Sequence, residues 1–249
     1  LQTFCEETFE FRVLVDAFAT YNYVELPEQP TIAIIPGPPT LFKAILPTER
    51  SLGTAFALCM KGEDHWGNPS DLCDQTFKVV ANMTVAGLPD AITFAKGAFA
   101  AIADDLRMQT TGDLIIELVD GEGGTVARSN PCRFSENAAL LPYWGDLHGQ
   151  SEETIGTNSA REFYEFARDK AFLDICVHQG NDFQISNEFW QHLNELSAEF
   201  TVDDSFIVFP GWEWSGNTGL GGDRNVLHMT EGRPIHRSSH ALVDDLSDL

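Results

Sequence analysis

The hydrophobic and polar positions in the second half of the chain predict strands that alternate with helices. Residues 173–177 and 206–209 are short, mainly apolar runs that favour buried strands. Between them, apolar side chains recur at the spacing of one helix face: Phe189, Leu193, Leu196 and Phe200. A further helix is expected after Ser159, which fits a capping box with Glu162. This alternation is typical of parallel βαβ units.

The first half has a different pattern, which predicts a domain built from strands. Residues 9–13 alternate between polar and apolar side chains, and residues 31–35 and 54–60 are apolar strand candidates. Residues 113–119 form another candidate, which ends at an Asp-Gly turn. Short strands between proline- and glycine-rich turns indicate a β-sandwich-like N-terminal domain over residues 1–137.

Side chains capable of binding a metal stand where the predicted strands of the second half end. Asp146 and His148 are separated by one residue, so in an extended backbone they project to the same side and one divalent ion can reach both. His178 ends the next strand, and the strand over 206–209 runs through Pro-Gly-Trp into Glu213. A simpler interpretation of the first pair, an N-cap Asp beside a hydrogen-bonded His, fits about as well.

The three strand ends follow one another at intervals of roughly 30 or more residues, which is the length of one βαβ unit. Parallel strands joined in this way point their carboxyl ends in one direction, where α/β folds build their sites. The four side chains are therefore expected to converge. Imidazole and carboxylate groups from separate strands bind zinc, manganese or iron, and such a metal lowers the pKa of a bound water.

These motifs resemble those of the polymerase-and-histidinol-phosphatase (PHP) superfamily. Its first motif reads Asp-x-His-x-His, which residues 146–150 match except at the last position. Residues 210–213 resemble its Gly-x-Glu motif, whose Glu bridges metals. The resemblance implies a distorted barrel of seven βα units that binds two or three metals and hydrolyses phosphate esters.

The chain is similar, more closely still, to an uncharacterised bacterial family related to the PHP superfamily. The four motifs of that family lie here at residues 143–151, 178–185, 210–218 and 221–226. The expected fold class is therefore α/β and β multidomain, with an N-terminal β-sandwich followed by the first part of a PHP-like distorted (β/α)7 barrel over residues 138–249. An α/β barrel typically needs more than about 200 residues, so the chain is expected to be truncated and to lack later ligands.

Site roles follow from the motifs and the resemblance. The expected metal ligands are Asp146, His148, His178, Glu213 and His240. The expected catalytic residues are His178 or Asp182 as general acid and Arg224 as the group that neutralises the oxyanion. The expected substrate-binding residues are Gln150, Asn181, Asp223, Arg224 and Arg237.

Alternatives stay open for several of these residues. Gln150 replaces the second His of the superfamily motif, and an amide oxygen is a poorer zinc ligand than imidazole, so one metal position is in question. Asp223 and Arg224 fit a glycine-rich turn, where they would pair with each other, about as well as an anion site. Arg237 and His240 fit surface or cap positions equally well.

The acidic composition indicates which classes of partner the chain can bind. The formal net charge is -23 and the pI is about 4.4, so the surface repels nucleic acid and anionic membranes. The expected partner is a small anionic ester, with no nucleic acid and no membrane. Such acidity also suits a solvated surface in saline surroundings. The five cysteines show no CxxC spacing, and the chain begins at Leu1 rather than Met, which makes a periplasmic or secreted location plausible.

The sequence is compatible with three functions. The leading hypothesis is a metal-dependent hydrolase of phosphate or sulfate esters, in which a metal-activated water attacks the substrate. The second is a non-catalytic binding or scaffold protein with a degenerate barrel. The third is a carbohydrate-active enzyme that uses Glu213 and Asp223 as paired carboxylates without a metal, which accounts poorly for the His positions.

Overall fold

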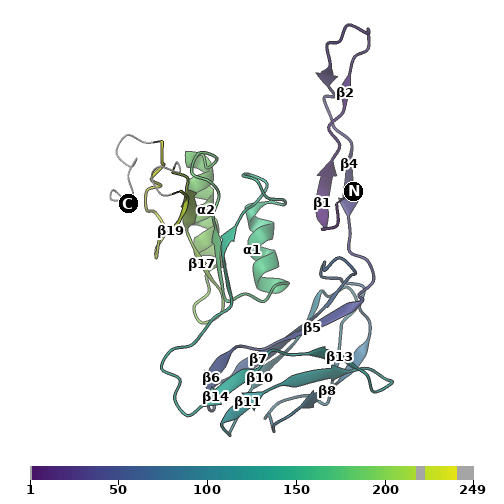
Figure 1. Cartoon of the computed structure of the whole chain (residues 1–249), viewed down its shortest axis with the longest axis vertical. Helices are drawn as coiled ribbons and strands as arrows, with labels where there is room; N and C mark the ends of the chain where they lie inside the picture. The colour runs from purple at the N-terminus through teal and green to yellow at the C-terminus, as the bar shows by residue number, and fades with distance from the viewer. Residues whose placement is uncertain (1, 217–221, 240–249) are drawn as a thin grey trace.

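The N-terminal residues form a two-stranded ribbon that projects from the rest of the molecule (Figure 1). The structure is a computed structural model and describes residues 2–216 and 222–239. In the ribbon, β1 (Glu6–Glu10) pairs antiparallel with β4 (Thr31–Ile34), and β2 (Leu14–Val15) pairs antiparallel with β3 (Val24–Glu25). The side chains of these strands are exposed or half-buried, so the ribbon has no core of its own.

A body of three sheets follows the ribbon. The first sheet has the order β10 (Ala100–Leu106), β7 (Phe56–Glu63), β5 (Leu41–Ile45). The second has the order β11 (Gly112–Leu114), β14 (Cys132–Ser135), β6 (Glu49–Ser51). The third has the order β13 (Thr125–Arg128), β12 (Ile116–Val119), β8 (Thr76–Ala81), β9 (Ala91–Thr93).

One hydrophobic core joins these three sheets. Along β7, Phe56, Leu58 and Met60 are buried while the residues between them are half-buried, because alternate side chains of a strand face opposite sides. Phe77 on β8 and Leu118 on β12 reach the same core. Burial of these large apolar side chains stabilises the body at roughly 1.5–3 kcal/mol for each.

The second half contains a small parallel sheet with two helices. Its strands lie in the order β15 (Gly145–Gly149), β16 (Ile175–His178), β17 (Ile207–Phe209), and both pairings are parallel. The connections between them contain α1 (Ala160–Asp169) and α2 (Asn187–Phe200). The capping box expected at Ser159 and Glu162 is present. The apolar face expected for the second helix is buried at Leu193, Leu196 and Phe200.

The expected (β/α)7 barrel is wrong. Within residues 2–216 and 222–239 strands predominate, there are two helices, and the parallel sheet stays open at three strands. Pro210 separates β17 from β18 (Gly211–Trp214), and β18 pairs antiparallel with β19 (Arg224–Leu227). A barrel requires a helical crossover at this point, whereas an antiparallel hairpin returns the chain beside itself and cannot continue a parallel sheet.

No helix of the described residues is long and apolar enough to cross a membrane.

The end of β16 is fixed by a buried histidine. The His178 side chain is 1% exposed and packs edge-on against the rings of Phe163 and Phe189. Its Nδ1 accepts the N–H of Gly180 at 3.2 Å, so in the neutral ring the proton lies on Nε2, which is 2.8 Å from the Ser151 hydroxyl. Burial lowers the pKa of His178 from 6.5 to about 4, because the charged imidazolium loses its hydration.

We expect this pKa shift to make stability depend on pH. The unfolded chain binds a proton at His178 more readily than the folded chain, so His178 favours folding above pH 6.5 and loses this contribution as the pH falls towards 4. The loss is on the order of 3 kcal/mol. Urea unfolding between these pH values should show a steeper fall in the wild type than in His178→Gln.

The control for this comparison is His192→Gln, because His192 is exposed on α2. That variant should keep the pH slope of the wild type. An equal slope in wild type and His178→Gln would contradict the burial of a neutral His178.

Candidate functional site

Side chains from β15, β18 and β19 meet beside the end of the parallel sheet. His148 lies on β15, Glu213 on β18 and Asn225 on β19. The Nε2 atom of His148 is 4.0 Å from Oε2 of Glu213, and its Nδ1 atom is 3.0 Å from Oδ1 of Asn225. Glu213 and Asn225 are cross-strand partners in the hairpin, so their side chains share one face.

Asn225 determines which nitrogen of His148 carries the proton. The amide group of Asn225 donates through Nδ2 to the carbonyl of Leu147 at 3.0 Å, which turns its Oδ1 towards the imidazole ring. An amide oxygen only accepts, so Nδ1 of His148 must donate. In the neutral ring Nε2 then carries a lone pair, which faces the carboxylate of Glu213.

Glu213 is held on both its backbone and its side chain. Its N–H donates to the carbonyl of Gly180, and its own carbonyl accepts the N–H of Asp182, both at 2.9 Å. Asn181 lies between these two residues and donates from Nδ2 to Oε2 of Glu213 at 2.9 Å. The Glu213 side chain is 12% exposed, so the carboxylate is largely shielded from solvent and has a fixed orientation.

Asp146 lies on β15 next to His148 and is half-buried. Its Oδ1 accepts the backbone N–H of His148 at 2.9 Å. This bond is the one that the simpler interpretation of the Asp-x-His pair expects, and it positions the backbone that carries His148. The same carboxylate is a possible metal ligand beside the imidazole.

The side chains of His178 and Asp182, two other expected site residues, form hydrogen bonds inside the fold. Both ring nitrogens of His178 are engaged, with Ser151 and Gly180. The carboxylate of Asp182 is buried and accepts from the N–H groups of Ser215 and Ser238 and from the Ser238 hydroxyl.

Arg237 is also used in hydrogen bonds within the protein. Its guanidinium donates to the carbonyls of Asp182 and Ile185 and to Oδ1 of Asn187. These three bonds attach the segment around Ser238 to the loop that follows β16.

The remaining expected residues are Asp223, Arg224, Gln150 and His240. Asp223 and Arg224 are exposed, and Arg224 donates to the backbone carbonyl of Asp223 at 2.7 Å rather than to its carboxylate. Gln150 has a buried Oε1 without a hydrogen-bond partner among the described residues. His240 lies outside the described residues.

The described residues bring together two candidate metal ligands, fewer than the three or four protein ligands of an ordinary zinc site. Over residues 2–216 and 222–239, no group of three or more His, Cys, Asp or Glu side chains is close enough together to hold a metal ion. Of the expected ligands, His148 and Glu213 approach each other through their side chains to 4.0 Å. The pair can share a proton, a water or a cation between its two acceptor atoms.

Sequence reasoning missed the role of Asn225. The residue lies in the motif at 221–226, but neither its side-chain type nor its spacing points to a metal or a substrate. The role could have been predicted from a hairpin in which Asn225 lies directly opposite Glu213. Such a prediction requires the strand register, which the structure supplies.

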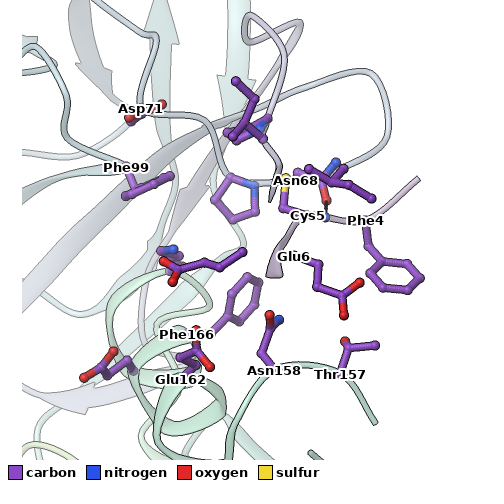
Figure 2. A pocket seen from close by; sticks show the side chains of 18 of the residues that line it. Phe4, Cys5, Glu6, Asn68, Asp71, Phe99, Thr157, Asn158, Glu162 and Phe166 are labelled. Carbon is purple, nitrogen blue, oxygen red and sulfur yellow. Dashed lines mark hydrogen bonds between the residues drawn. The ribbon is translucent and has the colours of Figure 1, made fainter. Parts of the chain in front are cut away.

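A separate cavity lies away from this cluster (Figure 2). It has a volume of about 1300 Å³ and is lined by the base of the ribbon, the loop around Trp66 and one side of α1. Among the expected site residues that the structure describes, Gln150 is the one that lines it. This cavity and the His148–Glu213 pair are therefore two different places on the molecule.

Comparison with known proteins gives distant relatives. No family model matches the chain. An uncharacterised protein of Chlamydia pneumoniae is 23% identical over 71% of this chain and 29% of its own length. Uncharacterised proteins of Chlamydia trachomatis and Chlamydia muridarum are 23% and 22% identical, over 78% and 100% of this chain. The chain spans 32% and 40% of these two relatives, so it corresponds to well under half of each protein that it matches.

Proposed function

We propose that the chain is part of a metal-dependent hydrolase and that His148 and Glu213 hold its divalent ion. The observation that carries the proposal is the 4.0 Å approach of Nε2 of His148 to Oε2 of Glu213. Asn225 leaves a lone pair on that nitrogen, so two acceptors face each other. Such an arrangement is stable when a cation or a proton lies between them.

The chemistry of the two donors fits zinc, manganese or iron. Bonds from zinc to imidazole nitrogen and to carboxylate oxygen are each about 2 Å long, and in a tetrahedral site two donor atoms lie about 3.3 Å apart. The two side chains, which are 4.0 Å apart, would therefore move closer together by a fraction of an ångström to hold an ion. Asp146 is the nearest further carboxylate on β15, and water would complete the coordination. When bound, a divalent ion of this kind polarises an ester and lowers the pKa of a water at neutral pH.

Neighbouring side chains would hold the two proposed ligands in a fixed orientation. Asn181 holds the carboxylate of Glu213, and Asn225 holds the ring of His148, as the outer partners of metal ligands do in other proteins. Arg224 follows on the exposed strand β19, where its guanidinium is available to a phosphate or sulfate ester. We propose the relation to the PHP superfamily on the motifs alone, without its barrel.

A second candidate function is a non-catalytic binding protein. The observation that favours it is the use of His178, Asp182 and Arg237 in internal hydrogen bonds, which removes three expected site residues from chemistry. Metal content distinguishes the two candidates, because only the first requires an ion at His148 and Glu213.

We expect the purified protein to contain zinc, manganese or iron in a stoichiometric amount. Plasma mass spectrometry should show that this metal falls in His148→Ala, which removes the imidazole, and in Glu213→Gln, which replaces the carboxylate with the weaker amide donor. The variant His192→Ala is the control, because His192 is exposed on α2. A wild type that stays metal-free after reconstitution would exclude the hydrolase and favour the binding protein.

We expect Asn225 to act on metal affinity through the His148 ring. Asn225→Leu removes the acceptor for Nδ1 and should weaken metal binding by about 10–100-fold in a competition titration with a chelator. Asn225→Asp keeps an acceptor at the same position and should retain most of the affinity.

The two Asn225 variants separate orientation from simple loss of packing. Both lose the amide N–H that binds the Leu147 carbonyl, so the loss of this hydrogen bond is common to the two variants. Equal affinity in the two variants would show that the ring of His148 does not depend on this acceptor.

A further inference from the structure

The cavity beside α1 combines aromatic side chains with acidic ones. Figure 2 shows Phe4 and Glu6 on one side of the cavity and Glu162 and Phe166 from α1 on the other. The aromatic lining residues are Phe4, Trp66, Phe99, Phe163 and Phe166. The acidic ones are Glu6, Glu7, Asp71, Glu162, Glu165 and Asp169, and Lys170 is the one basic residue of this described lining.

Most of this negative charge is left without a cationic partner. Among the described residues, Asp169 is the one lining acid in an ion pair, which it forms with Arg168. The neighbouring Glu152 has a raised pKa, because burial removes its hydration and because Glu153, Glu162 and Glu6 repel a further negative charge. The mouth of the cavity therefore has a negative potential that favours a cation.

The aromatic lining can also accept a cation. The ammonium of Lys170 already lies 4.0 Å from the centre of the Phe99 ring. Such contacts form because the face of an aromatic ring carries partial negative charge. Trp66 is 66% exposed, Phe4 is 44% exposed and Phe166 is 43% exposed, so aromatic surface remains uncovered at the cavity.

We propose that this cavity binds a small organic amine, an ammonium group on an aromatic or aliphatic body. The cavity volume of about 1300 Å³ is above the roughly 300–1,000 Å³ of ordinary ligand pockets, so a small amine would occupy one part of it. The apolar body of the ligand packs between Phe4, Phe166 and Trp66, and its ammonium faces Glu6 and Glu165, because Glu162 is bound in the capping box and Asp169 is paired with Arg168. The site is separate from His148 and Glu213, and it does not depend on metal binding.

Three probes of similar size test the charge of the ligand: phenethylamine, phenethyl alcohol and hydrocinnamate. Isothermal titration of the whole chain should give the tightest binding for the amine, about tenfold tighter than the neutral alcohol, and the weakest for the anion. Added sodium chloride should weaken the amine more than the alcohol, since salt screens the acids.

Matched variants locate the binding. Glu6→Gln and Phe166→Ala should each weaken the amine by about threefold or more. The controls Glu195→Gln and Phe183→Ala alter exposed residues that do not line the cavity, and they should leave the affinity unchanged.

Three results would overturn the proposal. They are equal affinity for the amine and the alcohol, equal effects of the cavity variants and their controls, and no saturable binding of the amine in the millimolar range. Circular dichroism of each variant confirms that a lost affinity does not come from a lost fold.

Discussion

The candidate site depends on one backbone contact, the insertion of Glu213 between Gly180 and Asp182. These hydrogen bonds, each 2.9 Å long, join the hairpin of β18 and β19 to the loop that follows β16. They fix the backbone that carries the Glu213 carboxylate beside His148. Because Asn225 is paired with Glu213, the same contact also brings the amide that orients the imidazole.

Close packing at two glycines allows this contact to form. A Cβ atom at Gly211 would lie 2.4 Å from Nε2 of Gln179 and 2.5 Å from a methyl carbon of Val177, so β18 can pass against the end of β16 only without a side chain there. A Cβ at Gly180 would lie 2.5 Å from a methyl carbon of Thr154. The buried carboxylate of Asp182 then fixes the loop by accepting hydrogen bonds from Ser215 and Ser238.

The distribution of charge gives the two sites different chemistry. Around His148 the polar groups are the orienting amides of Asn181 and Asn225, which suits the metal site proposed there. At the cavity beside α1 the unpaired carboxylates outnumber the single lysine, which suits a cation. A net charge of -23 describes the whole surface and predicts neither site, since binding responds to the local field.

The sequence by itself determined the local elements of the second half and the positions of its candidate ligands. The capping box at Ser159 and the apolar stripe of α2 depend on residues close in sequence, and both are present as expected. The tertiary structure alone decided that β18 turns back into a hairpin instead of continuing a barrel, and that His178 and Asp182 are used inside the fold. Strand pairing and burial join residues far apart in the chain, so a short motif fixes which groups are available but not which of them meet.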